Sequence, residues 1–523
     1  MSSAPITAGD REPSRISPRR LARAVGEHPL LVAVGLIALV TLVRAQGTVD
    51  GDVAWQLWIA RQLNHGAHLY RDIIETNPPL WFWMAMPVDQ LSGLVHVRSD
   101  HLLILLIGCA AALAIVATDR LASAIPAPRR TLLLAYASLI LVAMPWVEIG
   151  QREHIALIGA LPYAALIAAR RSGRGVPMSL AIAVGAGAAL GFALKPYFLI
   201  VPASLELWLM AGQGRRWRPL RPEIAAMAGL GTAYAVALAA LAQDYFTTVL
   251  PMLLLAYGAT GAKHWIDLFQ PAVLTALASI LLLLGSRRLV WSEESGVAAA
   301  LTVAAVAFTI VYFVQAKGWS YHAVPMLACA SIALAAALVA GTSPARLTIL
   351  AAPALLLLPF SIAAQHEARE PASTQDVTNA LAGLQPEATV GMISTNPSFG
   401  WPAVLERGLR FPLRYNGFWM MQAIVTNEAH GGRDPRLTAL GRAVARQAAA
   451  DFECTPPQRI VIDRPTPQQA RRGDFDILAF FLREPQFAAL LAHYRPVQWT
   501  SVETFALAVP IVRPANCPHW SPV

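Results

Sequence analysis

The chain has 523 residues, of which 56% are hydrophobic and only 14% are charged. Soluble globular proteins carry about 25% charged residues, so this composition excludes an ordinary soluble protein and predicts a polytopic membrane protein. The net charge of +9 does not indicate nucleic-acid binding, because the arginines stand in short clusters between apolar segments. Such clusters are typical of the cytoplasmic loops of membrane proteins.

Residues 1–27 are polar and basic and precede the first apolar segment. A cleaved signal peptide is the alternative to a cytoplasmic tail, and it is disfavoured because many further apolar segments follow. We therefore expect a transmembrane catalytic domain over 28–364. Segments close to the length that crosses a bilayer predict about eleven spanning helices. The predicted spans are 28–46, 101–118, 131–147, 154–170, 178–194, 197–212, 224–242, 271–286, 296–314, 322–340 and 347–364.

Alternation from a cytoplasmic N-terminus places the arginine-rich loops on the cytoplasmic side, as the positive-inside rule requires. Their arginines are Arg120, Arg129, Arg130, Arg171, Arg174, Arg215, Arg216, Arg218, Arg221, Arg287, Arg288 and Arg346. The unusual polar loops then fall outside, and the first of them, 47–100, is far too long for a turn. We expect an interfacial helix there, with the aromatic residues around Trp81 at headgroup level, and a second one between Tyr245 and Tyr257.

Residues 365–523 carry many charges and prolines and no spanning segment, which predicts a small α/β domain on the periplasmic side. Cys454 and Cys517 lie in this domain, where an oxidising compartment would permit a disulfide. The sequence supplies no geometry, so the pairing stays open. Strands are expected at 389–394, 459–463 and 504–512, and helices at 375–384, 437–450 and 477–494.

Carboxylates stand at the start of the first outer loop. Asp50 and Asp52 follow the first span, and a carboxylate held near a reacting hydroxyl can act as a general base. The alternative is an N-cap for a helix over 53–63, because aspartate is a favoured capping residue. We favour catalysis for Asp52 and leave the two roles open for Asp50.

A rigid segment follows in the same loop. Asn77, Pro78 and Pro79 predict an extended turn, because proline restricts both itself and the preceding residue. This turn would aim Glu75, a further candidate catalytic acid. Proline pairs alone indicate only the end of a loop.

Two further outer loops hold candidate functional residues. Gln151-Arg152-Glu153-His154 is a dense polar patch in a loop that needs only a turn. Arg152 is a candidate for binding a phosphate and Glu153 is a candidate acid. The alternative for the patch is interfacial snorkelling of long side chains.

The three lysines of the chain, Lys195, Lys263 and Lys317, all fall in expected outer loops. Cations on the outer side depart from the positive-inside bias. One explanation is that these lysines bind a phosphate anion. Tyr321 and His322, close to Lys317, belong to the same candidate phosphate site. The alternative for each lysine is an exposed interfacial charge.

No cofactor is certain from the sequence. A divalent cation is an open alternative, with His154, His264 and His322 as candidate ligands, although no tight ligand spacing supports it. The chain has no Walker loop, no G-x-G-x-x-G opening a helix, no C-x-x-C and no G-x-S-x-G. Nucleotide chemistry on a soluble domain is therefore unsupported.

The first outer loop resembles that of GT-C fold glycosyltransferases, and most closely the bacterial aminoarabinose transferases and protein O-mannosyltransferases. The residues that carry the resemblance are Asp52, Ile59-Ala60-Arg61-Gln62-Leu63, Gly66, Tyr70 and Pro78-Pro79-Leu80. The resemblance covers this loop closely and the layout of spans followed by a periplasmic domain loosely.

The resemblance implies that Asp52 is the catalytic base or orients the acceptor, and that Glu153 is the acid of the second outer loop. The segment from Lys317 to His322 resembles the loop of the family that binds the lipid phosphate. The family commonly has lysine or histidine before the two prolines, whereas this chain has Asn77 there. That departure puts the phosphate contact of this position in doubt.

We therefore expect an inverting glycosyltransferase in a bacterial inner membrane, acting at the periplasmic face. It would move a hexose or pentose from a polyprenyl-phosphate donor to a hydroxyl or phosphate of a lipid, glycan or protein acceptor. The leading alternative is a transporter or flippase of lipid-linked sugars, but the duplicated halves and broken helices typical of transporters are not seen in the sequence. A surface-polysaccharide polymerase or ligase is a third alternative.

Overall fold

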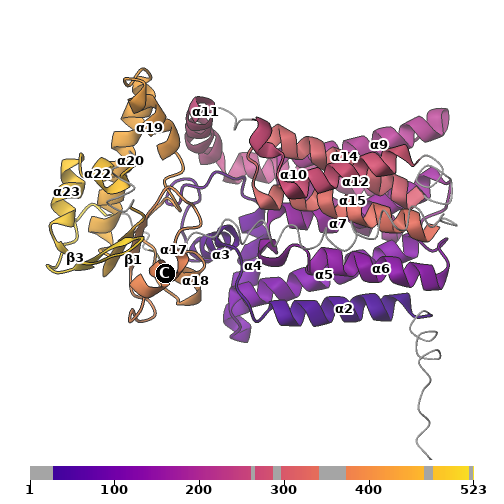
Figure 1. Ribbon diagram of the computed structural model, residues 1–523, viewed down its shortest axis with the longest axis horizontal. Helices are drawn as coiled ribbons and strands as arrows, with labels where there is room; N and C mark the ends of the chain where they lie inside the picture. Colours follow the sequence, from indigo (N-terminus) through magenta and orange to yellow (C-terminus); the bar gives the residue numbers. More distant parts are fainter. Residues whose placement is uncertain are drawn as a thin grey trace, which may run out of the picture.

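The computed structural model describes residues 27–260, 265–286, 296–340, 373–464, 475–517 and 522. Several expectations fall outside these ranges: nearly all of the N-terminal tail, the last span at 347–364, Lys263, and His264. The described chain forms a helical bundle and a C-terminal domain that contains a small sheet (Figure 1).

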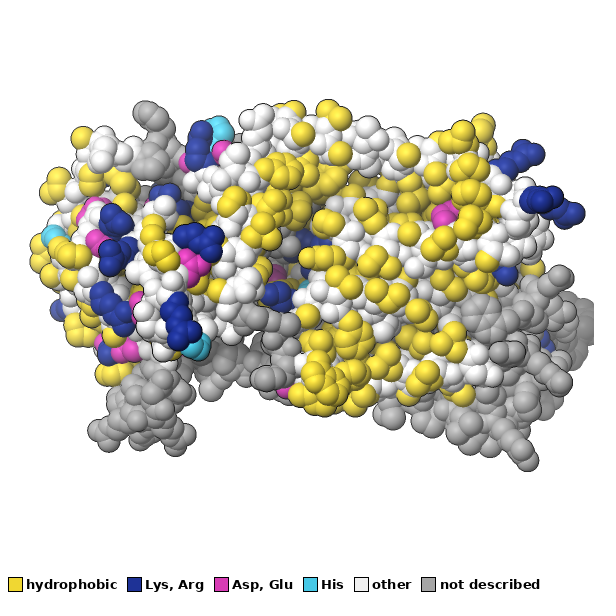
Figure 2. Space-filling model, turned by 90° about the horizontal axis from the view of Figure 1, so that it is seen from above, with side chains coloured by type: hydrophobic (Ala, Val, Ile, Leu, Met, Phe, Trp, Pro, Cys, Tyr) yellow, Lys and Arg dark blue, Asp and Glu magenta, His cyan; other side chains and the backbone are white. Residues whose placement is uncertain are grey.

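The bundle consists of apolar helices that coincide with ten of the predicted spans (Figure 1). Four described helices, α5, α10, α14 and α15, are both long and apolar enough to cross a membrane. Hydrophobic side chains dominate the face of the bundle in Figure 2, while lysine and arginine gather on the C-terminal domain and at the far end of the bundle. The bundle helices are α2 (Pro29–Arg44), α5 (Ser99–Leu121), α6 (Ala127–Val142), α7 (Arg152–Arg171), α8 (Met178–Phe192), α9 (Ile200–Gln213), α10 (Pro222–Leu241), α12 (Pro271–Gly285), α14 (Gly296–Gln315) and α15 (Ser320–Ala340).

The loops between these helices gather at two opposite ends. At one end Arg174 donates to a carbonyl at the end of α5 (2.7 Å), and Arg170 pairs with Glu223 on α10 (3.0 Å). At the other end, which faces the C-terminal domain (Figure 1), Gln151 donates to Asp50 (2.9 Å). Arginine-rich loops and polar loops are therefore separated as the charge pattern predicts.

Two helices fill the first loop, between the bundle and the C-terminal domain (Figure 1): α3 (Gly51–Asn64) and α4 (Leu80–Val95). The expectation that the aromatic residues of α4 lie at headgroup level is wrong for Trp81 and Phe82, which are 2% and 0% exposed. Trp81 donates its indole N–H to the carbonyl of Gly150 (3.0 Å). These rings pack inside the protein, because α4 is covered by its neighbours.

The second expected interfacial helix is also present, as η4 (Tyr245–Val249) continuing into α11 (Leu250–Thr260). It lies beside the C-terminal domain (Figure 1), where Tyr257 packs against Trp419 with ring centroids 5.4 Å apart. Short turns connect the other bundle helices. They are η1 (Trp146–Glu148), η2 (Pro196–Leu199), η3 (Gly214–Arg216) and η5 (Trp265–Leu268).

The C-terminal domain is the predicted α/β unit. Its sheet has the order β1-β2-β4-β3, in which β1 and β2 are parallel and the other pairs are antiparallel. The strands are β1 (Val390–Ile393), β2 (Arg459–Ile462), β3 (Tyr494–Trp499) and β4 (Glu503–Leu507). The helices are α17 (Ser373–Ala380), α18 (Ala403–Glu406), α19 (Met421–Ala429), α20 (Pro435–Cys454), α22 (Ile477–Phe481) and α23 (Pro485–Leu491).

The prediction of one helix over 477–494 is wrong. The chain forms two short helices there and enters β3 at Tyr494. Pro485 lies in the first turn of α23, a position that suits proline because its missing N–H has no partner in a first turn. The same proline interrupts a continuous helix, because it cannot donate to the preceding turn.

The C-terminal domain is held against the first loop by polar and aromatic contacts. The N–H of Ile74 donates to the carbonyl of Arg414 (2.8 Å). Trp55 on α3 packs edge-on against Trp401 and Phe411 of the domain, with ring centroids 5.5 Å and 6.0 Å apart. These contacts fix the segment around Trp401 over the start of α3.

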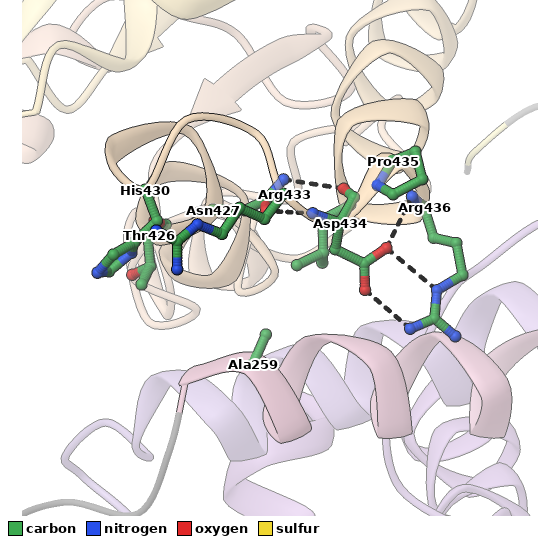
Figure 3. Close-up of a pocket in the computed structure, with 9 residues that line it drawn as sticks. Ala259, Thr426, Asn427, His430, Arg433, Asp434, Pro435 and Arg436 are labelled. Carbon is green, nitrogen blue, oxygen red and sulfur yellow. Dashed lines mark hydrogen bonds and ion pairs between the residues drawn. The ribbon is translucent and has the colours of Figure 1, made fainter.

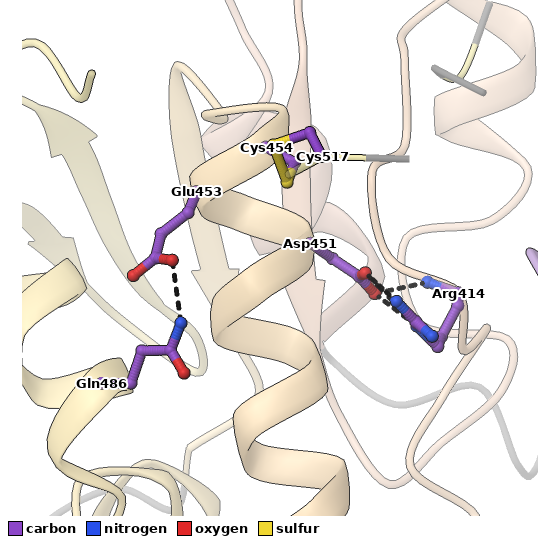
Figure 4. The surroundings of a disulfide bond; sticks show 6 residues. All are labelled: Arg414, Asp451, Glu453, Cys454, Gln486 and Cys517. Atoms are coloured by element: carbon purple, nitrogen blue, oxygen red, sulfur yellow. Dashed lines mark hydrogen bonds and ion pairs between the residues drawn. A yellow bond between two sulfur atoms is a disulfide. The ribbon is translucent and has the colours of Figure 1, made fainter. Parts of the chain in front are cut away.

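Cys454 and Cys517 form a disulfide, with Cα atoms 5.5 Å apart. The sequence had left open whether these two cysteines pair. The bond ties the end of α20 to the C-terminal segment, close to the ion pair between Arg414 and Asp451 (Figure 4). Disulfides of this kind are typical of oxidising compartments.

Replacing Cys454 with serine should destabilise the C-terminal domain by about 4 kcal/mol, because the bond closes a long loop and limits the unfolded chain. Thermal unfolding of the purified protein in detergent would show a lower Tm. The variant Cys517→Ser, alone or combined with Cys454→Ser, should give the same shift. Cys109 is exposed and free, so Cys109→Ser is the matched control, and an unchanged Tm in Cys454→Ser would contradict a stabilising bond.

Candidate active site

Asp52 lies in the first turn of α3, where the bundle meets the C-terminal domain. Its carboxylate accepts no hydrogen bond from the residues that the structure describes, and it lines a cavity of about 490 Å³. Burial raises the pKa of Asp52 to about 6; Arg152 opposes this increase, while Glu75 and Glu148 add to it. A carboxylate with this pKa is suited to accept a proton near neutral pH.

Asp50 is the N-cap of α3. One of its oxygens accepts from the N–H of Asp52 and from the side-chain amide of Gln151, both at 2.9 Å. The capping alternative therefore describes Asp50 in this structure, as expected for an aspartate before a helix. Through these two bonds Asp50 fixes the start of α3 against the start of α7, and so positions Asp52.

Glu75 is buried and held by several donors. Its Oε2 accepts from the indole N–H of Trp55 (2.7 Å), and its Oε1 accepts from the backbone N–H and side-chain amide of Asn77 (2.9 and 2.7 Å). The hydroxyl of Thr76 adds a longer bond (3.1 Å). A carboxylate with so many donors is fixed in place, so the structure favours a positioning role and an electrostatic effect on Asp52.

The turn that aims Glu75 is built as the prolines predict. Pro79 occupies the N-cap position of α4, and Pro78 precedes it. Tyr70 donates its hydroxyl to the carbonyl of Asn77 (2.7 Å) and has a positive φ of 72°. Tyr70, Asn77, Pro78 and Pro79 therefore shape the loop, and Asn77 orients Glu75.

Arg152 is the first residue of α7 and is 4% exposed. Its Nε and one terminal nitrogen are buried and have no hydrogen-bond partner within the described ranges. The guanidinium lies 5.7 Å from the ring of Phe82. An unsatisfied buried cation is costly, and the positive end of a helix adds to its field, so this position favours an anion.

Lys195, Glu153 and His322 meet, as the sequence could not show. The ammonium of Lys195 lies 2.6 Å from Glu153, 3.2 Å from Gln315 and 3.3 Å from His322. Burial lowers the pKa of Lys195, whereas the carboxylate of Glu153 raises it. The second oxygen of Glu153 is buried and has no hydrogen-bond partner in the described part of the chain. Much of the lysine charge is therefore balanced by Glu153.

Tyr321 and Ser320, at the start of α15, line the same cavity as Asp52. Ser320 donates to Glu148 (2.6 Å), and so couples α15 to the loop before α7. Lys317 lies apart from this group, with its ammonium 3.5 Å from the ring centre of Tyr257 on α11. Lys317 therefore lies beside the helix expected between Tyr245 and Tyr257.

His154 and His322, the two candidate metal ligands that the structure describes, make other contacts. Both ring nitrogens of His154 bind backbone groups: one donates to the carbonyl of Leu141 (2.7 Å) and the other accepts from the N–H of Gly150 (3.2 Å). His322 lies 3.3 Å from the ammonium of Lys195. No cluster of three or more histidine, cysteine or acidic residues that could hold a metal exists among the described residues. The proposal of His154 as a ligand is corrected by these contacts.

The presumed location of the C-terminal domain suggested a role in selecting the acceptor, but no sequence motif marked the residues that it contributes to this cavity. Asn396, Ser398, Phe399, Trp401 and Glu406 line it opposite Asp52. These residues lie far from Asp52 along the chain and match no motif. Only the packing of the domain onto α3 reveals them.

A second cavity, of about 570 Å³, lies between the end of α11 and the turn from α19 to α20 (Figure 3). Its lining includes Ala259, His430 and Arg433. Figure 3 shows Asp434 already paired with Arg436, at 2.8 Å. The cavity contains none of the predicted site residues, and we assign it no chemistry.

No family model and no curated protein matches the chain. Among solved structures, the Archaeoglobus fulgidus oligosaccharyltransferase AglB with an inhibitory peptide and a dolichol-phosphate is similar at 13% identity and a TM-score of 0.42, over 95% of this chain and 75% of that one. The same enzyme with Zn and sulfate has the same identity and TM-score, over 92% and 74%. ArnT from Cupriavidus metallidurans bound to undecaprenyl phosphate is similar at 12% identity and a TM-score of 0.40, over 91% and 97%.

At these identities and TM-scores we draw no function from the likeness. The function proposed below is argued from the residues of the site.

Proposed function

We propose that the chain is an inverting glycosyltransferase that moves a sugar from a polyprenyl-phosphate donor to an acceptor hydroxyl. One observation carries the proposal. Within the described part of the chain, the buried guanidinium of Arg152 has two nitrogens without a hydrogen-bond partner, and it acts electrostatically on the carboxylate of Asp52, which lines the cavity at the same end of the bundle. Buried polar groups without partners are rare in folded proteins, and one beside a carboxylate that lines a cavity favours a binding site for reactants.

The charge pattern supports a membrane orientation for this site. With the arginine-rich end in the cytoplasm, Asp52 and the C-terminal domain face the periplasm of a bacterial inner membrane. The disulfide between Cys454 and Cys517 fits that compartment. No nucleotide sugar is available there, so a lipid-linked sugar supplies the activated donor.

The proposed reaction needs one base and one anion site. Asp52 accepts the proton of the acceptor hydroxyl, whose oxygen forms the new bond to the anomeric carbon of the sugar. The bond from that carbon to the phosphate oxygen breaks, and the electron pair leaves with the polyprenyl phosphate. Arg152 stabilises this anion. Holding both reactants at one site removes much of the entropic barrier.

The other cations have supporting roles. Glu153 lies 2.6 Å from Lys195 and offsets its charge. Arg152 has no ion-pair partner among the described residues, so it contributes more to phosphate binding. Lys195 lies close enough to Asp52 to oppose the increase in its pKa. Lys317, beside α11, is placed to meet the lipid phosphate from the membrane side.

The rate should depend on the ionisation of Asp52. Because burial raises its pKa to about 6, kcat/KM should rise about tenfold per pH unit below 6 and level off above it, since only the ionised form accepts a proton. The measurement is a pH profile of kcat/KM for the acceptor, with saturating donor and acceptor concentrations well below its KM. If kcat/KM does not change between pH 4.5 and pH 7.5, Asp52 is not the base. These two pH values lie about one unit or more on either side of the pKa.

A cellular test addresses the reaction as a whole. Mass spectrometry of envelope lipids and glycans, with and without this chain, should show one sugar missing from an acceptor when the chain is absent. Its polyprenyl-phosphate donor should accumulate at the same time. Identical glycans in the two samples would contradict the proposal.

A further inference from the structure

The cavity beside Asp52 has two walls. The start of α3, η1 and the start of α15 supply one, and residues 396–406 of the C-terminal domain supply most of the other. The walls touch directly, because a Cβ added at Gly51 would lie 2.8 Å from the Cβ of Ser398. A volume of about 490 Å³ falls within the range of roughly 300–1,000 Å³ that is usual for ligand sites.

The lining of this cavity is acidic. It includes Asp50, Asp52, Glu148 and Glu406, and none of its described lining residues is lysine or arginine. A phosphate placed there would meet charges of its own sign, and such contacts cost several kcal/mol in binding. Arg152, the candidate for the donor phosphate, is not part of the lining. Its charge nonetheless acts on Asp52, which lines the cavity, so the anion site adjoins the cavity.

Trp401 adds an aromatic ring and a hydrogen-bond donor to the acidic lining of the cavity. It is 5% exposed, and its indole N–H is buried and has no hydrogen-bond partner among the described residues. Its ring is held by Trp55 and Phe411, with centroids 5.5 Å and 5.6 Å away. A fixed aromatic face with an N–H donor suits a ligand that has an apolar face and hydroxyl groups.

We infer that this cavity, here termed the acceptor cavity, binds a sugar of the acceptor that carries no negative charge. The sugar ring lies against Trp401, one hydroxyl accepts from the indole N–H, and the reacting hydroxyl points to Asp52. The carboxylates exclude an acceptor phosphate. The inference rests on the proposed function and adds the chemical class of the acceptor.

The test compares three matched acceptors: a neutral methyl hexoside, the same hexoside with a phosphate, and the same hexoside with an amine. The purified full chain would be supplied with a panel of undecaprenyl-phosphate-linked hexoses and pentoses. Transfer to the neutral hexoside and to the amine should each exceed transfer to the phosphorylated form by at least about tenfold in kcat/KM, because only the phosphate meets charges of its own sign. Preference for the phosphate would overturn the inference and leave glycosyl transfer standing.

Two variants test the contacts of the acceptor cavity. Trp401→Phe keeps an aromatic ring and removes the N–H, and should raise the acceptor KM about tenfold with the donor KM unchanged. Glu406→Gln removes one negative charge from the lining, so it should lower the ratio of kcat/KM for the neutral hexoside to kcat/KM for the phosphorylated hexoside. The control is Trp499→Phe, since Trp499 lies on β3, is 43% exposed and does not line the cavity. An acceptor KM unchanged in Trp401→Phe would overturn the inference.

Binding without donor separates the two proposals. Saturation-transfer NMR should detect the neutral hexoside on the wild-type chain, with a weaker signal for Trp401→Phe and none for the phosphorylated form. Binding of this kind without transfer from any donor of the panel would support the acceptor cavity and contradict the proposed function. Absence of binding by the neutral hexoside would overturn the acceptor cavity.

Discussion

Replacing Asp52 with asparagine should lower kcat by about 10²- to 10⁴-fold, the usual contribution of a general base, and leave the protein folded. Asparagine has nearly the same size and cannot accept the proton of the acceptor hydroxyl. The carboxylate of Asp52 holds no hydrogen bond to the residues described, so the change breaks no contact of the fold. The measurement is the turnover of undecaprenyl-phosphate-linked sugar, with circular dichroism to verify the helices.

The matched variant is Asp50→Asn. Asparagine is a good N-cap, so the bond from the N–H of Asp52 should persist and activity should fall far less than in Asp52→Asn. The pair therefore separates chemistry from capping. Full transfer by Asp52→Asn would exclude this residue as the base.

Replacing Arg152 with glutamine should weaken binding of undecaprenyl phosphate by about 10- to 100-fold, because a charge-assisted hydrogen bond contributes about 1.5–3 kcal/mol. Its guanidinium has unpartnered buried nitrogens at the start of α7. Arg152→Lys should restore the charge and only part of the affinity, since lysine lacks the planar fork of arginine. Equilibrium binding of the lipid phosphate in detergent would measure the effect.

A control for this prediction lies at the opposite end of the bundle. Arg215 is exposed in η3, so Arg215→Gln should leave lipid-phosphate binding unchanged. If Arg152→Gln and Arg215→Gln bind undecaprenyl phosphate equally well, Arg152 does not hold the donor phosphate.

The features that the sequence predicts are those that local composition determines. Apolar length places the bundle helices, and the arginine clusters mark the loops that gather at one end. The turn at Pro78-Pro79 and the start of α3 after Asp50 also follow from local preferences. Asp52 could be singled out because it stands in this short, regular stretch.

The features that the sequence does not predict depend on contacts between distant segments. The group of Lys195, Glu153 and His322 forms only because three separate elements of the bundle meet. The role of Asn77 in holding Glu75 needs the folded turn, and the burial of Trp81 needs its neighbours. Residues this far apart carry no local signal of proximity.

The C-terminal domain shows the same limit. Its strands β1, β2 and β4 were expected from apolar, β-rich stretches. The prediction of one helix over 477–494 was wrong because it followed the amphipathic pattern and did not take account of Pro485. The position of Trp401 over α3 has no counterpart in the sequence, because it results from the docking of a whole domain.

The central claim is that the bond between the sugar and the lipid phosphate is broken at the site of Asp52. A transporter would instead move the intact donor across the bilayer. The most direct measurement uses the purified chain in liposomes containing undecaprenyl-phosphate-linked sugar and a neutral hexoside. Mass spectrometry would count both products. We predict that undecaprenyl phosphate and the new glycoside appear in equal amounts with the wild-type chain and are lost with Asp52→Asn. Donor that crosses the bilayer intact, with no undecaprenyl phosphate released, would contradict the account and indicate a transporter.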